Sequence, residues 1–253
     1  MALDFSRQKT AKQLLEIDWQ HPVWKPEVED AGAGRTVSVM REYALPIDEA
    51  YALVADGDQR PLLILRECER CKGTDHALLS RTMDNEQTVL LTSWFRCVKL
   101  PPNVLGETHP FSNLFKQGEG VGSPHLFFAD HNGAHHTPLP GDQAQSQLWR
   151  TMFAYLDRNY EGDARKSLKG LRKLLDQFDR LDSREQDVKA RMEREIDKRG
   201  ARSPKLRKLK RQLDELAKER DALRASEKKL RALALTAASE STEAEQPAAA
   251  GAG

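Results

Sequence analysis

Cysteine is scarce in this chain of 253 residues, which has only Cys68, Cys71 and Cys97. An odd and small number of cysteines does not form the disulfide framework of a small secreted protein. In a reducing compartment, two cysteines close together in sequence are more typical of a redox or metal site than of a structural bridge. The spacing of Cys68 and Cys71 therefore indicates a redox or metal site rather than a structural disulfide.

Long apolar runs are also missing. The chain has no stretch of about 18 apolar residues, so we expect no membrane-spanning helix. The first residues lack the apolar run of a signal peptide. We therefore expect a cytoplasmic protein that contacts no membrane.

The chain has little net charge, but its charges are unevenly distributed. Residues 1–162 hold 16 Lys and Arg against 22 Asp and Glu, whereas residues 163–235 hold 24 against 14. Such a contrast predicts separate structural units. We predict an N-terminal extension over 1–34, an α/β domain over 35–162, a basic helical hairpin over 163–235 and a disordered tail over 236–253.

The predicted α/β domain alternates strand and helix patterns. Strands are predicted over 35–42, 61–65 and 94–100, and a hairpin over 124–129 and 134–138 around Asn132-Gly133. Helices are predicted over 5–17, 47–54, 72–84 and 143–160, a helical turn at 113–115, and irregular chain over 18–34. The apolar run 61–65 is expected to be a strand buried on both faces. This order predicts a mostly parallel central sheet with one antiparallel edge.

The basic segment shows a heptad pattern. Leu206, Leu209, Leu213 and Leu216 are spaced by 3, 4 and 3 residues, and Leu168, Leu171, Leu175 and Phe178 follow the same spacing upstream. The residues Gly200-Ala-Arg-Ser-Pro204 interrupt the pattern, since Gly suits a helix end, Ser a cap and Pro a first helical position. We predict two antiparallel helices, 164–198 and 204–234, each about 45–50 Å long.

The cysteine pair lies where the apolar run 61–65 meets a helical pattern. A thiol at a helix N-terminus is favoured as a thiolate, because the helix dipole stabilises negative charge there. A second thiol one turn further can attack a mixed disulfide and release the partner. The pattern therefore predicts a redox-active pair, Cys68 and Cys71.

These features resemble a thioredoxin-like domain over roughly residues 35–160. The resemblance rests on the apolar run leading into Cys68-Glu-Arg-Cys71, on Val98-Lys-Leu100, and on the segment from Gly122 to Gly133. It implies a thiol–disulfide oxidoreductase in which Cys68 is the nucleophile and Cys71 the resolving thiol. Protein thiols and disulfides would be its partners, and no cofactor or metal is expected.

The resemblance also implies a substrate-contacting segment. A cis-proline faces the dithiol in this family, and Pro124 matches its position. Pro124 and the backbone of Ser123 would contact the partner's sulfur or peptide. His125 follows directly and either reaches the dithiol or packs within a strand.

Three departures from the family pattern leave a second interpretation open. The family's buried acid falls on Leu62, Glu67 replaces the usual Trp, and Glu69-Arg70 replaces Gly-Pro between the cysteines. Nearby acidic residues raise a thiol pKa and nearby basic residues lower it, so the net effect stays open. The alternative is a non-catalytic interaction protein on a thioredoxin-like scaffold.

Other candidate ligands and reactive groups have simpler interpretations. A structural zinc site needs four ligands, and no second closely spaced pair accompanies Cys68 and Cys71. Cys97 lies in an apolar strand pattern and is expected to be a buried small residue. The histidines 131, 135 and 136 are expected to belong to a solvated turn.

The predicted hairpin has three interpretations: a solvated coiled coil, a module for assembly or for docking a partner protein, or a nucleic-acid contact through the basic residues 205–211. No aromatic residue interleaves these charges and acidic residues alternate along the segment, so the sequence weighs against nucleic acid.

Overall fold

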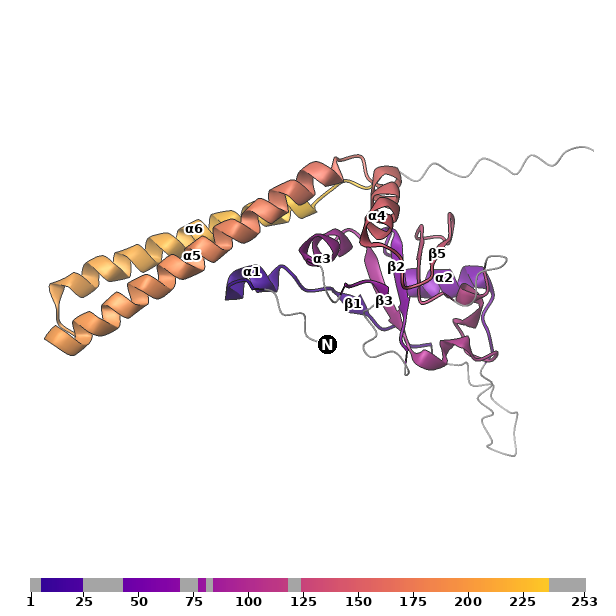
Figure 1. Ribbon diagram of the computed structural model, residues 1–253, viewed down its shortest axis with the longest axis horizontal. Coiled ribbons are helices and arrows are strands. Elements are labelled where there is room, and N and C mark those ends of the chain that lie inside the picture. Colours follow the sequence, from indigo (N-terminus) through magenta and orange to yellow (C-terminus); the bar gives the residue numbers. More distant parts are fainter. Residues whose placement is uncertain (1–5, 25–42, 69–76, 81–83, 118–123, 237–253) are drawn as a thin grey trace, which may run out of the picture.

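The computed structural model describes residues 6–24, 43–68, 77–80, 84–117 and 124–236 (Figure 1). Its centre is a five-stranded sheet in the order β1-β3-β2-β4-β5. The strands are β1 (Trp19–Gln20), β2 (Leu62–Arg66), β3 (Arg96–Leu100), β4 (Leu126–Ala129) and β5 (Thr137–Leu139). β1, β3 and β2 are parallel, whereas β4 runs antiparallel to β2 and β5 antiparallel to β4. The expected mixed sheet of an α/β domain is confirmed.

The edge strand β1 corrects the prediction that residues 18–34 are irregular. Trp19 pairs with Cys97 and Gln20 with Val98, so the N-terminal segment extends the sheet beyond β3. The strand expected over 35–42 and the tail 237–253 lie outside the described residues.

The central strand β2 is buried on both faces, as predicted. Leu62, Leu63, Ile64 and Leu65 are all 0% exposed. Because side chains alternate along a strand, Leu62 and Ile64 belong to one core cluster, and Leu63 and Leu65 to the other.

The two faces of the sheet are covered by different elements (Figure 1). One face carries α2 (Ile47–Ala55) and the 3₁₀ turns η2 (Pro102–Leu105) and η3 (Ser112–Phe115). The other carries α3 (Glu86–Thr92), α4 (Gln145–Asn159) and the first half of α5 (Ala164–Arg199). The sheet is therefore the middle of three layers, a common solution for a strand that is apolar on both faces.

The helix expected over 72–84 is wrong within its described part. Residues 77–80 form turns, and the α-helix α3 begins only at Glu86. The side chain of Asn85 accepts a hydrogen bond from Ser80 N and donates one to Ser80 O, which fixes a turn ahead of α3. Leu78 and Leu79 are nonetheless buried.

The connection of the hairpin is longer than the predicted one, which ended at residue 133. β4 and β5 pair antiparallel, but the returning strand begins at Thr137 rather than at residue 134. Asp130 organises the connection, because its backbone bonds both Ala134 and Gly133, and its carboxylate lies 2.6 Å from His135 Nδ1.

Gly133 offers a sharp test of this turn. Its φ is +86°, and an added Cβ would lie 2.4 Å from Cδ2 of Tyr51. Gly57 is the matched control, because its φ is +75° but nothing lies within 4 Å of an added Cβ. We expect Gly57→Ala to cost about 1–2 kcal/mol through backbone strain. Gly133→Ala should cost about 1–3 kcal/mol more in urea unfolding, through the clash with Tyr51. Equal losses would argue against this contact.

Two long helices follow the domain, close to the predicted limits. α5 ends at Arg199 and α6 (Pro204–Arg231) packs against it, which confirms the helix pair (Figure 1). Gly200 has a φ of +75° and its N–H bonds Ile196 O, so it ends α5 as predicted. Ser203 does not cap α6 through its side chain; its hydroxyl donates instead to Glu195 Oε1 at 2.6 Å.

The helix pair is held against the domain by the N-terminal segment. The helix expected over 5–17 is the short α1 (Lys9–Gln13). Ahead of it, Arg7 bonds Glu86 of α3 and Asp179 of α5, which joins the domain to the stalk formed by α5 and α6. Burial alone would lower the pKa of Arg7, but its hydrogen bond with Glu86 outweighs that effect and the pKa is raised.

Candidate functional site

The candidate site lies at one end of the central strands, where β2 ends and β4 begins. Because β2 and β4 are antiparallel, the last residues of β2 face the first residues of β4, and Leu65 pairs with Leu126. The N–H of Arg66 donates to the carbonyl of His125 at 2.9 Å. Cys68 follows two residues after Arg66, so it emerges at the end that also carries Pro124 and His125.

The structure describes three of the five predicted site residues. Cys68 is half-buried, Pro124 is buried and His125 is half-buried. Cys71 and Ser123 lie outside the described residues, and so does the peptide bond before Pro124. The dithiol and the cis-proline therefore stay predictions.

Arg66 and His125 contact each other at the end of β2 that leads to Cys68. Arg66 Nη2 lies 3.3 Å from His125 Nδ1, and Arg66 Nε donates to the carbonyl of Pro124 at 3.5 Å. Burial, and then the charge of Arg66, lower the pKa of His125. At neutral pH the imidazole is therefore neutral, so Nδ1 can accept a hydrogen bond from the guanidinium. This arrangement places a cation two residues before the predicted nucleophile.

The backbone leading to Cys68 is fixed by β3. Glu67 N donates to Leu100 O at 2.8 Å, which continues the parallel pairing one residue beyond β2. Lys99 of β3 lies over the ring of Trp19, 4.6 Å from its centroid. Cys68 thus directly follows an anchored stretch of backbone.

Leu62, which the resemblance aligns with a buried acid of thioredoxin-like proteins, is fully buried within the cluster that also holds Ile64 and Phe127. No carboxylate therefore stands at this position to take a proton from a resolving thiol.

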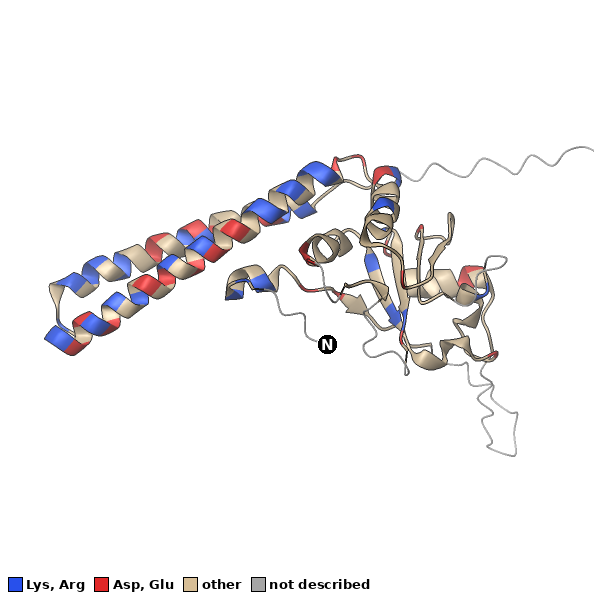
Figure 2. Cartoon of the chain, viewed as in Figure 1, with Lys and Arg blue, Asp and Glu red and all other residues tan. Residues whose placement is uncertain are grey.

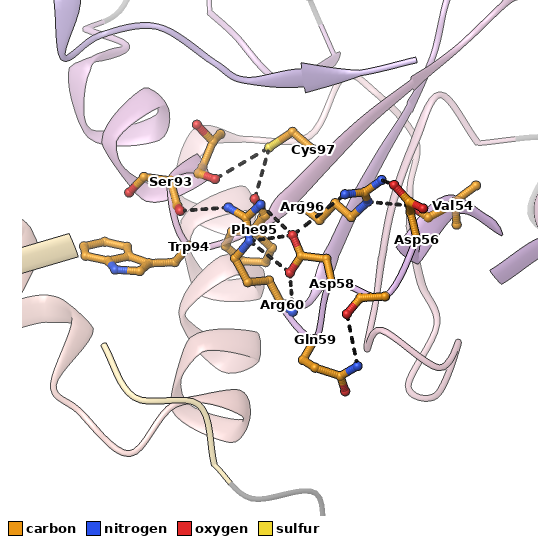
Figure 3. A network of polar contacts seen from close by, with 12 residues as sticks. Val54, Asp56, Asp58, Gln59, Arg60, Ser93, Trp94, Phe95, Arg96 and Cys97 are labelled. Carbon is orange, nitrogen blue, oxygen red and sulfur yellow. Dashed lines mark hydrogen bonds and ion pairs between the residues drawn. The ribbon is translucent and has the colours of Figure 1, made fainter. Parts of the chain in front are cut away.

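Polar contacts at the opposite end of the central strands have a structural role (Figure 3). Arg60 pairs with Asp58 at 2.7 Å and donates to Ser93 O, while Arg96 donates to Val54 O. Burial alone would raise the pKa of Asp58, but hydrogen bonds from Arg60 outweigh it and the pKa is lowered. These contacts fix the loops that lead into β2 and β3.

Cys97 is a buried small residue, as predicted. It is 2% exposed, and burial raises the pKa of its thiol to about 12. Its thiol lies 3.6 Å from the carbonyl oxygen of Thr92. At neutral pH it stays protonated and shielded, so it does not compete with Cys68.

The three histidines near the hairpin do not share one site. His135 contacts Asp130, whereas His136 packs against Phe127 with tilted rings whose centroids are 4.6 Å apart. Within the described ranges, no group of three or more His, Cys, Asp or Glu residues could hold a metal ion. The contacts of His135 and His136 are accounted for by packing of the turn.

Sequence reasoning missed the contact between Arg66 and His125. In the sequence, Arg66 is only a charge near the cysteines, and His125 only the residue after Pro124. The signal that joins them is the antiparallel register of β2 and β4, which places Arg66 opposite His125. That register depends on tertiary packing rather than on a local motif.

Comparisons with known proteins identify no relative: the chain matches no protein-family model, no curated protein and no solved structure. Among the described helices, none is both long and apolar enough to cross a membrane.

Proposed function

We propose that this chain is a thioredoxin-like thiol–disulfide oxidoreductase in which Cys68 is the nucleophile and Cys71 the resolving thiol. The observation that carries the proposal is the position of Cys68, directly after the central strand β2 and at the end where Pro124 and His125 begin β4. The strand order, three parallel strands followed by an antiparallel pair, agrees with the resemblance.

The proposed reaction transfers two electrons. The thiolate of Cys68 attacks one sulfur of a protein disulfide, and the other sulfur leaves as a thiolate that takes up a proton. The thiolate of Cys71 then attacks the sulfur of Cys68 and releases the second substrate thiol. The substrate is reduced, and the pair Cys68 and Cys71 is oxidised to a disulfide.

Arg66 supports the first step of this reaction. A guanidinium near a thiol stabilises the thiolate, which is the nucleophilic form. Arg66 is held by the carbonyl of Pro124 and by the ring of His125, so its charge stays at the predicted substrate-contacting segment. In this proposal Ser123, Pro124 and His125 contact the substrate beside the reacting sulfurs.

The redox couple can be tested with glutathione buffers. We expect the wild-type protein to form an intramolecular disulfide as the buffer becomes more oxidising, and to lose two maleimide-reactive thiols. Cys68→Ser and Cys71→Ser should abolish this couple. Cys97→Ser is the matched control and should keep it, because Cys97 is buried and protonated. If wild-type protein forms no such disulfide at any accessible potential, the oxidoreductase proposal is wrong.

The burial of Leu62 favours a second candidate, a non-catalytic interaction protein on the same scaffold. Without a buried carboxylate, the resolving thiol has no proton acceptor at the position where the family has one. Turnover of insulin disulfides separates the two candidates. A dithiol couple with no turnover above the Cys68→Ser background would support the interaction protein, with the stalk as its assembly or partner-binding module.

A further inference from the structure

The end of the stalk that lies away from the domain carries a run of basic residues with no acidic residue among them. Residues 198–211 comprise the end of α5, the connecting turn and the first two turns of α6. This segment is called the basic tip here. Its cations are Lys198, Arg199, Arg202, Lys205, Arg207, Lys208, Lys210 and Arg211, and all of them are exposed. Figure 2 shows Lys and Arg at the end of the helix pair that lies away from the domain, where α5 ends and α6 begins.

These cations are largely uncompensated. Within the part of the chain that the structure describes, Arg199 is the only one of them in an ion pair, with Glu195 at 3.4 Å. Further along the stalk the charges alternate, and pairs such as Arg184 with Glu219 form between the helices. The fold therefore places a local positive charge at the tip, although the net charge of the whole chain is small.

The tip offers little apolar surface. Leu206 is 5% exposed, and Leu209 packs against the stalk's own cluster. Ile196, 42% exposed, is the one large hydrophobic side chain of the described stalk that is exposed. The buried core of a protein interface is apolar and rich in aromatic residues, Met and Arg, and it is depleted in Lys. Membrane-binding helices likewise insert apolar side chains. One isoleucine supplies neither kind of surface.

The basic tip is also poorly suited to binding single-stranded nucleic acid. Proteins that bind it stack bases on aromatic side chains. No Phe, Tyr or Trp follows Phe178 in the chain, so the stalk beyond that residue has no stacking platform. Binding a duplex does not require aromatic side chains, because its phosphates present about one negative charge per 1.7 Å of helix axis.

We propose that the basic tip binds double-helical nucleic acid through its phosphate backbone, without reading its sequence. This partner is the one for which exposed cations without aromatic or apolar anchors are sufficient. With α5 spanning 36 residues, or about 54 Å, the site is well separated from Cys68 and independent of the proposed redox function.

The test uses the full-length protein and a fluorescein-labelled DNA duplex of mixed sequence. Fluorescence anisotropy measures the Kd across a series of NaCl concentrations. The tip variant carries Arg207→Gln, Lys208→Gln, Lys210→Gln and Arg211→Gln. The matched control carries Arg172→Gln, Lys173→Gln, Lys228→Gln and Lys229→Gln, four exposed cations near the base of the stalk. Both variants lose the same charge, and glutamine preserves helix propensity. Far-UV circular dichroism checks that both remain folded.

We expect the tip variant to bind at least about tenfold more weakly than wild type at low salt, and the control to change by less than about twofold. The dependence of log Kd on log salt should become shallower by about 0.9 for each phosphate that the variant no longer neutralises. A second duplex of unrelated sequence should bind equally well.

Three results would overturn the proposal. The wild-type protein could fail to bind the duplex at low salt. The two variants could weaken binding equally, which would assign the effect to net charge. Poly-glutamate or phosphatidylserine vesicles could compete as strongly as duplex DNA, which would assign the tip to acidic proteins or anionic membranes.

Discussion

Replacing Phe178 by alanine is expected to lower the free energy of unfolding by about 3–5 kcal/mol. Phe178 belongs to α5, yet it is 0% exposed and shares one core cluster with Trp94, Phe95 and Phe128 of the domain. The substitution would open a cavity at the junction of the stalk and the sheet. Urea denaturation followed by circular dichroism and by tryptophan fluorescence measures the loss.

Ile196→Ala is the matched control for this prediction. Ile196 lies on the same helix but is 42% exposed near the tip, so its truncation should cost less than about 1 kcal/mol. Because the first half of the stalk shares the core of the domain, we also expect both probes to report one transition. Equal losses in the two variants, or a stalk that melts separately, would contradict the shared core.

The stalk was predictable because its signals are local. Heptad spacing identifies a packed helix wherever it occurs, and Gly200 and Pro204 mark the boundaries through their own backbone preferences. The predicted limits, 164–198 and 204–234, differ from the observed ones by at most three residues. α6 ends at Arg231, and beyond it the chain pairs with the domain, where Leu235 forms a bridge with Tyr160.

The predictions that were wrong concern segments whose structure depends on tertiary contacts. β1 has two residues and no strand pattern, and it is a strand only because Trp19 and Gln20 pair with β3. α3 has the sequence Glu-Gln-Thr-Val-Leu-Leu-Thr, whose β-branched residues weaken its helical signal. Its buried face is stabilised by packing against the core rather than by propensity.

The candidate site also has features that could be predicted from local sequence and features that depend on tertiary contacts. The motif around Cys68 and the proline at 124 could be found in the sequence, because each has a local signature. Their placement at one end of the central strands depends on β4 running antiparallel to β2. The contact between Arg66 and His125 depends further on the register of that pair, which no local pattern specifies.

Asp182 is the second residue whose replacement should have a large effect, because it is a buried acceptor that joins three segments. Its carboxylate, 8% exposed, accepts hydrogen bonds from the N–H and the hydroxyl of Thr10, each at 2.8 Å. Arg220 of α6 donates to it at 3.2 Å. We expect Asp182→Ala to cost about 3 kcal/mol, because buried donors left without an acceptor keep their full desolvation penalty.

Two comparisons separate this effect from a general loss of charge. Asp187→Ala removes an exposed carboxylate from the same helix and should change stability by less than about 0.5 kcal/mol. Thr10→Val keeps the shape of the side chain but removes its hydroxyl, so a double-mutant cycle with Asp182→Ala should give a coupling energy of about 0.5–3 kcal/mol. Hydrogen exchange should also quicken in α1, since Asp182 of α5 holds Thr10 within that helix. Additive losses and unchanged exchange would mean that other contacts, such as those of Arg7, hold the N-terminal segment on the stalk.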